Sequence, residues 1–444
     1  MMADAIGNKI ANGDDGSEII DRILNAGRKL GYETEVYFVT GKGINLELKG
    51  KLIGEACGSE TWAMGVRVIK DGRIGCSSTN SPSRWEDCLN SAIAGSKFSD
   101  MQEWGGMAKP SKPAVSSLNV FDKNIADCDI ATAKELIERM LSAAEGKGAE
   151  IAGGSGSLSV GTTTVANTEG VCYSLEKTGC GVSMETIDGT STGYEFDSSG
   201  FLKDLDPERV GREACEMAVF SKNGGDIATG KYDVILSPLS VCQLLSAVVI
   251  PSLSGRNVHS KRSYLEGKLG ECVFDEKLSL YDNPFEGESA RLYDAEGVPT
   301  KRIDFVKDGV VEAFAYDLRT AYRYGEKSTG SAVRAGAGGA PVIGTHNICL
   351  DGKRENIFDE KAVFATGIVG AHTANGVTGD FSVELSNASW MNAGVKENPI
   401  KSAMLSGNIF DMLKNLSGIS KESRDFGSGV IPYLRFSELS VIGR

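Results

Sequence analysis

Only three histidines, His259, His346 and His372, offer this 444-residue chain an imidazole for metal or acid–base chemistry. Zinc hydrolases hold their ion with two or three convergent side chains and leave one coordination position open for water. The spacing His346-Asn-Ile-Cys349 resembles a ligand pair, but 347–350 is predicted to be a strand, on which residues three apart face opposite sides. We therefore predict that His346 has a structural role or faces solvent. His259 is expected to be exposed in a loop.

Two glycine-containing segments, 334–344 and 154–157, do not match known catalytic motifs, and His372 lies in neither of them. Arg334–Gly344 is rich in glycine, but a phosphate loop needs a following helix and a Lys-Ser/Thr pair, whereas Pro341 and a strand follow here. This pattern predicts a flexible loop or a close backbone crossing. Gly154–Ser157 precedes a strand, which argues against a nucleophile turn. His372 follows small residues and is a candidate to line a cleft.

Turn signals and apolar periodicity predict the elements that must position such residues. Acidic–glycine pairs between apolar runs mark hairpins at Asp71-Gly72, Glu169-Gly170, Asp188-Gly189 and Asp308-Gly309. Helices are predicted at Ser17–Leu30, Ser83–Phe98, Ile130–Lys147, Pro207–Lys222, Leu239–Ile250 and Ser406–Leu416, and a last strand at Tyr433–Ile442. Because strands come in consecutive groups with helices between the groups, the fold class is α+β. The 239–250 helix is apolar nearly all round and is therefore expected to be buried.

The length of the chain favours two or three domains. The glycine-containing stretch Asn223–Lys231, between a helix end and a strand, is the best boundary. We predict an N-terminal α/β domain with hairpins and flanking helices over 1–225, with a possible subdivision near 109–128. Residues 226–444 are expected to form a strand-rich domain with an antiparallel or barrel-like sheet.

Composition excludes several classes of function. A net charge of −13 disfavours direct nucleic-acid binding. The ten cysteines are scattered without a Cys-x-x-Cys pair, which is typical of a reducing cytosol. Met1–Gly16 lacks the pattern of a secretory signal, and the longest apolar stretch, Leu239–Ile250, is shorter than the ~20 residues that cross a bilayer. We expect a cytoplasmic protein with no membrane partner.

Four groups of segments, in order along nearly the whole chain, resemble the PmbA/TldD family, also called modulators of DNA gyrase. They are Gly65–Gly75 with Ser77–Thr79; Val165–Gly170 leading to Gly211–Ala218; Asp294–Arg302 with Tyr316–Ala321 and Ser328–Gly330; and Asn398-Pro399 with Ser406–Asn408 and Asp411–Asn415. Each motif is short, and their combination is specific.

The resemblance implies where a relative's metal would be. TldD-type members resemble zinc peptidases with a His-Glu-x-x-x-His helix and a cysteine near the C-terminus, in which the Glu activates a zinc-bound water. In the matching helix here, Ser246 and Ala247 replace the His-Glu pair and Pro251 replaces the second His. No cysteine follows Cys349. The chain thus resembles the PmbA/TldE branch, with no catalytic residues and no cofactor of its own, zinc being expected only in a TldD-type partner.

The resemblance further implies a two-component metalloprotease that acts on flexible peptides, such as antitoxin-like proteins and microcin precursors. In it this chain would be a non-catalytic subunit that binds and positions the substrate, and exposed strand edges would hold an extended peptide. Candidates for the substrate channel, for which hairpin packing is the competing interpretation, are Tyr316, Asp317, Arg319, Thr320, Arg334 and His372. A homodimeric peptide-binding protein without protease activity and an independent enzyme using His372 remain alternatives.

Overall fold

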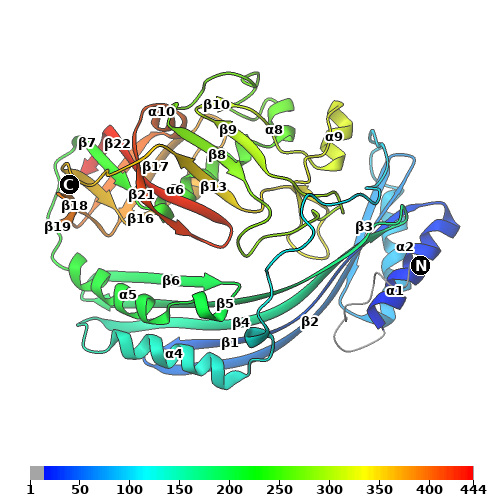
Figure 1. Ribbon diagram of the computed structural model, residues 1–444, viewed down its shortest axis with the longest axis horizontal. Helices are drawn as coiled ribbons and strands as arrows, with labels where there is room; N and C mark the ends of the chain where they lie inside the picture. Colours follow the sequence, from blue (N-terminus) through cyan, green and yellow to red (C-terminus); the bar gives the residue numbers. More distant parts are fainter. Residues whose placement is uncertain (1–14, 444) are drawn as a thin grey trace.

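The computed structural model describes residues 15–443 and contains two large β-sheets, one in each half of the chain (Figure 1). Nearly all of the Met1–Gly16 segment lies outside the described residues. The predicted α+β class is confirmed, with a strand-rich C-terminal half. None of the helices within 15–443 has the length and apolar character needed to cross a membrane.

The first sheet has six antiparallel strands in the order β3-β2-β1-β4-β5-β6. They are β1 (Glu33–Lys49), β2 (Leu52–Lys70), β3 (Arg73–Thr79), β4 (Glu150–Asn167), β5 (Cys172–Asp188) and β6 (Ser191–Ser199). The predicted hairpins at Asp71-Gly72, Glu169-Gly170 and Asp188-Gly189 join β2 to β3, β4 to β5 and β5 to β6. Both Asp71 and Gly72 have positive φ, as a tight hairpin turn requires.

Two groups of helices cover the same face of this sheet, at its two ends (Figure 1). Val36 and Phe38 of β1 pack against α1 and α2, whereas Leu46 and Leu48 of the same strand pack against the other group. Because alternate residues of a strand point to opposite faces, the odd-numbered Tyr37 points the other way, toward the C-terminal half. The helices are α1 (Asp15–Leu30), α2 (Trp85–Ser96), α3 (Lys123–Ala126), α4 (Ile130–Ala144) and α5 (Pro207–Ser221).

The C-terminal half contains a 14-stranded sheet with the main path β10-β9-β8-β13-β22-β7-β15-β18-β19. The strands of this path are β7 (Gly230–Leu236), β8 (Leu278–Asp282), β9 (Ile303–Lys307), β10 (Val310–Val311), β13 (Ile348–Gly352), β15 (Ala362–Ala365), β18 (Ala388–Asn392), β19 (Val395–Ile400) and β22 (Gly429–Gly443). Strands β14 (Arg354–Glu355), β16 (Gly367–Val369), β17 (Asp380–Ser386), β20 (Ala403–Asn408) and β21 (Leu416–Asp425) complete it. The pair β11 (Ala332–Val333) and β12 (Val342–Ile343) is separate. Asp308-Gly309 makes the predicted β9–β10 turn.

Several predicted element bounds in this half were wrong. The helix predicted at Ser406–Leu416 is strand β20 followed by α10 (Ile409–Lys414), because the Asn408 side chain caps the helix by accepting from the Phe410 and Asp411 amides at 3.0 and 3.3 Å. The last strand begins at Gly429 rather than Tyr433. His259 lies at the end of the short helix α8 (Gly255–His259) rather than in a loop, although it is exposed as predicted.

The glycine-rich segment Arg334–Gly344 brings the two halves together. It connects β11 to β12, and a Cβ atom at Gly65 of β2 would lie only 1.8 Å from the Ala337 carbonyl oxygen. Only glycine at position 65 leaves room for this contact. The close backbone crossing predicted for this segment is therefore confirmed, and it fixes β2 against the C-terminal half.

Candidate functional site

The helix predicted at 239–250 begins one residue earlier and continues beyond Pro251. Ser237 caps it, since its Oγ accepts from the Ser240 amide at 3.2 Å, and Pro238 occupies the first turn, where its missing N–H is not needed. The chain then forms α6 (Pro238–Leu244), a π-helical turn (Leu245–Val249) and α7 (Ile250–Ser252).

The π turn has a local cause. Pro251 has no N–H to donate to the Ala247 carbonyl, and the Ile250 amide donates instead to the Leu245 carbonyl five residues back. In an α-helix, residues five apart are rotated by about 140° around the axis. The wider turn reduces this angle, so that Ser246 and Pro251 lie closer to one side of the helix.

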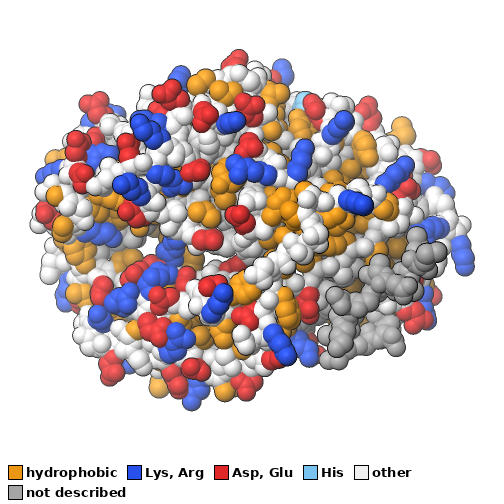
Figure 2. Space-filling view, viewed as in Figure 1, with side chains coloured by type: hydrophobic (Ala, Val, Ile, Leu, Met, Phe, Trp, Pro, Cys, Tyr) orange, Lys and Arg blue, Asp and Glu red, His pale blue; other side chains and the backbone are white. Residues whose placement is uncertain are grey.

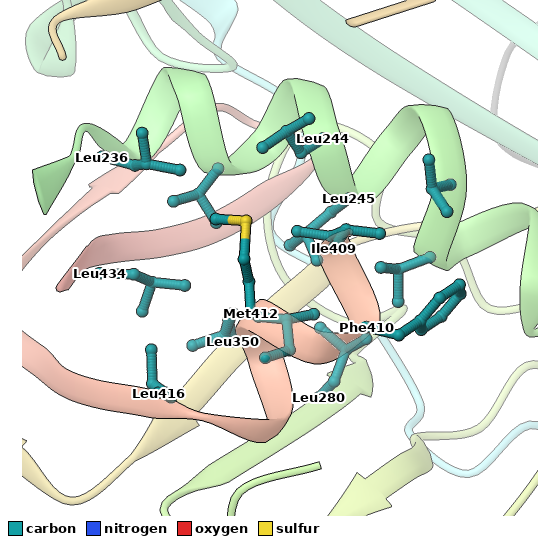
Figure 3. Packing of buried hydrophobic residues seen from close by; sticks show 14 of the residues in the cluster. Leu236, Leu244, Leu245, Leu280, Leu350, Ile409, Phe410, Met412, Leu416 and Leu434 are labelled. Carbon is teal, nitrogen blue, oxygen red and sulfur yellow. The ribbon is translucent and has the colours of Figure 1, made fainter. Parts of the chain in front are cut away.

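The opposite side of this helix is part of the main hydrophobic core. Figure 3 shows Leu244 and Leu245 above Ile409 and Met412 of α10, and all four side chains are buried. Burial of each such side chain stabilises the fold by about 1.5–3 kcal/mol, which anchors the helix firmly. Its orientation is thus set by the core, and the predicted burial is confirmed for this side.

The outward side carries the residues assigned to the metal positions by resemblance. Ser246 is exposed, and Ala247 and Pro251 are half-buried. The loop at Gly376 passes the Ala247 carbonyl. His372 lies on the 3-10 turn Ala371–Thr373 before that loop and is exposed.

A cleft of about 360 Å³ opens at the C-terminal end of this helix. Pro251 lines it together with Asp317, Arg319 and Thr320 from the start of helix α9 (Leu318–Tyr324). Its charged lining comprises Arg256, Arg319, Arg323 and Asp317. The Asp317 side chain accepts from the Thr320 amide at 2.8 Å as the cap of α9. Because the three arginines outnumber this one carboxylate, the net charge of the lining is positive.

Tyr316 lies beneath this cleft and joins α8 to α9. Its hydroxyl is 3.1 Å from Nε2 of His259, whose ring stacks on Tyr324 with centroids 4.2 Å apart. A Cβ at Gly255 would lie 2.2 Å from the Tyr316 ring, so only glycine admits the tyrosine here. Burial raises the pKa of Tyr316 to about 12, so its hydroxyl stays protonated and packs as a structural group.

Four buried charged side chains, those of Glu35, Arg67, Glu296 and Arg334, link the N-terminal sheet to the first turn of α9. Arg67 of β2 pairs with Glu35 of β1 at 2.8 Å and with Glu296 at 2.6 Å, and Arg334 pairs with Glu35 as well. All four side chains are at most 3% exposed. The second Glu296 oxygen accepts from the Leu318 amide at 2.8 Å. The N-terminal sheet thereby positions the first turn of α9.

The pKa shifts in this cluster follow from burial and neighbouring charge. Burial disfavours the charge of Arg67, but Glu35 and Glu296 outweigh it and raise the Arg67 pKa. Burial raises the pKa of Glu296 although Arg67 opposes the shift. Burial and the nearby Glu296 also raise the pKa of Asp294, which accepts from three backbone amides.

A larger cleft of about 810 Å³ separates β6 and α5 from the C-terminal sheet, and Figure 2 shows it as a hollow between the two halves. Strand β6 lines it and is the edge of the first sheet. The Phe196 carbonyl already accepts from Arg424 at 2.5 Å and from Arg209 at 3.3 Å, so this part of the edge is occupied.

Comparisons with known proteins identify the family. Domain 1, the central domain and the C-terminal domain of the PmbA/TldA metallopeptidases match residues 34–96, 123–220 and 229–443. An uncharacterised protein of Methanocaldococcus jannaschii is 31% identical over 399 residues, covering 89% of this chain and 93% of its own length. The chain belongs to the PmbA/TldD family.

Two further members of the family extend the match. The metalloprotease PmbA of Escherichia coli O157:H7 is 23% identical, over 93% of this chain and 94% of its own length. The crystal structure of TldE from Thermococcus kodakarensis superposes with a TM-score of 0.88 at 24% identity, covering 96% of this chain and 100% of that one. The latter likeness shows a shared fold.

The side chains on the outward face of the helix do not fit a zinc ion. Ser246, Ala247 and Pro251 provide a hydroxyl, a methyl and a pyrrolidine ring, whereas zinc is held by imidazole, thiolate or carboxylate. Across residues 15–443 no three His, Cys, Asp or Glu side chains lie close enough together to hold a metal. The helix of this PmbA/TldD chain therefore offers no zinc ligand at Ser246, Ala247 or Pro251.

The structure brings together some of the predicted site residues and separates others. Asp317, Arg319, Thr320 and Pro251 line one cleft, with Tyr316 beneath it. The remaining candidates lie elsewhere: Ser246 and Ala247 on the preceding turn, Arg334 in the buried ion cluster, and His372 on its exposed 3-10 turn.

His346 has the structural role predicted for it. It is 2% exposed, and its Nε2 lies 2.9 Å from the Gly330 carbonyl. Burial lowers its pKa to about 3, so the ring is neutral at pH 7.

Sequence analysis missed Glu35, Arg67 and Glu296 as the residues that position the cleft. Arg67 carried a usable signal, because it interrupts an apolar run between Val66 and Val68 on a strand. A charged residue in such a run needs a buried partner. Its partner Glu296 is 229 residues away, too far to be paired from local pattern.

Proposed function

We propose that this chain is the non-catalytic subunit of a two-component zinc protease, paired with a TldD-type chain that holds the metal. The observation that carries the proposal is the helix 238–252, which is anchored in the core and presents Ser246, Ala247 and Pro251, the residues that the resemblance assigns to the family's metal-binding motif. Family membership and the relatives named metalloproteases support a role in proteolysis.

Within that complex the chain binds and positions a flexible peptide. Two clefts support this role, the positively charged one beside α9 and the larger one bordered by the edge strand β6. An extended peptide is recognised through main-chain hydrogen bonds at a sheet edge and through side-chain pockets. The arginines Arg319 and Arg323 attract carboxylates and carbonyl oxygens of the substrate.

The first test is co-expression with a TldD-type chain from the same genome. We expect co-purification of the two chains, and cleavage of an unstructured peptide that falls at least tenfold when this chain is omitted. Zinc should accompany the partner, and this chain alone should purify without stoichiometric metal. Unchanged cleavage without this chain, or its purification as a stable homodimer with no affinity for the partner, refutes the proposal.

A second test separates substrate binding from assembly. Replacing Arg319 and Arg323 together by Ala removes two positive charges from the α9 cleft and one hydrogen bond, from Arg319 to Gln102, so the unfolding midpoint of the variant is measured as well. Cleavage by the complex should fall while co-purification is retained. Arg302→Ala, an exposed arginine paired with Asp304 outside the clefts, is the matched control and should leave cleavage unchanged.

A further inference from the structure

A third cavity, of about 510 Å³, lies between the inner face of the N-terminal sheet and the segment 288–295. Its floor consists of inward-facing residues of β1, β2, β4 and β5, mostly glycines and hydroxyl side chains such as Ser59, Thr61, Ser159 and Thr163. Strands β1 and β4 have a strand partner on both sides along the cavity, whereas residues 52–63 of β2 and 172–179 of β5 have one on a single side. A ligand in this cavity meets side chains from all four strands.

Two cations, Lys177 and Arg291, line the cavity. Lys177 projects from β5 and donates to the Glu288 carbonyl at 3.0 Å, and Arg291 donates from Nε to the Ser289 carbonyl at 3.1 Å. Within residues 15–443 neither has a carboxylate within 4.0 Å. The Glu288 carboxyl packs against Gly427 instead, where an added Cβ would lie 2.6 Å from its Cδ.

Burial makes the positive charge of Lys177 costly. Burial and the charge of Arg291 lower the pKa of Lys177 to about 7, although the nearby Glu288 carboxylate opposes this shift. A bound anion between the two cations removes this cost. Unpaired cations in a concave, hydroxyl-lined cavity are typical of an anion-binding site.

The lining also restricts the charge of the anion. The Glu288 carboxylate also lines the cavity, and its charge disfavours a dianion such as phosphate more than a monoanion. A single carboxylate suits a guanidinium, which binds it through two parallel hydrogen bonds. The rings of Tyr173 and Tyr293, with centroids 4.5 Å apart, form an apolar wall for the group that bears the carboxylate.

We propose that this cavity binds a carboxylate carried by a peptide, with Lys177 and Arg291 as its two cationic partners. The peptide nature of the ligand rests on the proposed function. The carboxylate comes from the C-terminus or from an acidic side chain, and the site then anchors one end or one residue of a substrate that extends toward the clefts.

Three fluorescent hexapeptides of glycine, serine and alanine test the proposal on the full chain by anisotropy. The first has a free C-terminal carboxylate, the second is amidated, and the third is amidated but contains one internal aspartate. We expect the free acid, the aspartate peptide or both to bind at least tenfold more tightly than the uncharged amide. Inorganic phosphate should compete weakly.

Variants of the two cations test whether the carboxylate peptide binds in this cavity. Lys177→Met and Arg291→Gln should each remove at least tenfold of the affinity for the carboxylate peptide and leave binding of the amide within twofold. Lys42→Met, an exposed lysine at the same cavity paired with Glu60 at 3.5 Å, is the matched control and should change little. Circular dichroism and the unfolding midpoint verify that each variant is folded.

Equal binding of the three peptides, absence of binding, or an affinity that Lys177→Met and Arg291→Gln leave unchanged overturns the carboxylate site. Each of these results leaves the zinc-bearing partnership intact, because that is read from co-purification and cleavage. Conversely, a carboxylate preference in a chain that never associates with a TldD-type partner supports this site and refutes the proposed function.

Discussion

Two charged regions join the N-terminal sheet to the C-terminal half, and they differ in the groups that their cations contact. In the ion cluster, Arg67 and Arg334 are each paired with a carboxylate, and one glutamate holds the first turn of α9. In the cavity below the segment 288–295, Lys177 and Arg291 donate to backbone carbonyls, and among the described residues 15–443 neither forms a salt bridge with a carboxylate.

This difference distinguishes a structural contact from a candidate binding site within the same interface, because only in the structural contact are the buried cations paired with carboxylates. A paired, buried cluster fixes geometry and leaves no affinity for a further ion. Unpaired cations beside a void store a cost that a ligand can remove. By this criterion the ion cluster positions the α9 cleft, and the Lys177–Arg291 cavity is available to an anion.

The largest expected effect comes from breaking the cluster at its centre. Arg67→Met leaves Glu35 and Glu296 buried without their shared partner and should lower the free energy of unfolding by about 3–5 kcal/mol. Urea unfolding followed by fluorescence measures the change. Lys177→Met should cost less than about 1 kcal/mol, because it removes one hydrogen bond to a backbone carbonyl and no salt bridge. Equal losses in the two variants contradict the comparison.

A double-mutant cycle sharpens the role of Glu296. In the Arg67→Met background, Glu296→Gln replaces an unpaired carboxylate with a neutral amide that still accepts from the Leu318 amide. The two substitutions together should therefore cost less than the sum of the single ones, with a coupling energy of about 0.5–3 kcal/mol. Strict additivity would show that Arg67 and Glu296 do not act as a pair.

The sequence predicted the local parts of this fold well. Asp71-Gly72 and Asp308-Gly309 occupy hairpin turns because the positive φ values that such turns need are a property of those residues. The buried helix after Ser237 was found because its cap, proline and apolar residues lie within one short segment. The helix predicted at Ser406–Leu416 was wrong at its start, since residues 403–408 pair with β17 and β22 as strand β20, and no local pattern specifies that pairing.

The candidate site was predictable only in part. Asp317, Arg319 and Thr320 lie within the single motif Tyr316–Ala321, so recognising this motif identifies all three residues together. Their meeting with Pro251 depends on a β-bridge between Ser254 and Ala315, which no local pattern specifies. Arg334 looked like a channel residue, but its side chain is 2% exposed beside Glu35, a partner almost 300 residues away. Long-range pairing of charges is what the sequence leaves undetermined.

The unpaired state of Lys177 should also appear in the pH dependence of stability. Its pKa is lowered from 10.5 to about 7, so the folded chain binds fewer protons than the unfolded chain between those values. The free energy of unfolding should therefore rise with pH across this window, by at most about 1.4 kcal/mol per pH unit for one proton.

Lys177→Met should remove this contribution to the slope, and the exposed Lys42→Met should retain it. Urea unfolding at a series of pH values from 7 to 10.5 provides the measurement. If the free energy of unfolding has the same slope against pH in the wild-type chain and in Lys177→Met, the pKa of Lys177 is not lowered and a nearby carboxylate compensates its charge. Lys177 would then resemble the arginines of the ion cluster.

The smallest loss of stability is expected for an arginine–glutamate pair that resembles those of the ion cluster but is exposed to solvent. Arg139 of α4 makes two hydrogen bonds to Glu208 of α5, at 2.7 and 2.8 Å, with both side chains more than 40% exposed. Water and salt screen this pair, so Arg139→Met should cost at most about 1 kcal/mol in urea unfolding. A loss as large as that of Arg67→Met would mean that bidentate geometry alone carries the energy. A small loss assigns the strength of the Arg67 cluster to its burial, the property that the Lys177–Arg291 cavity shares without the compensating carboxylates.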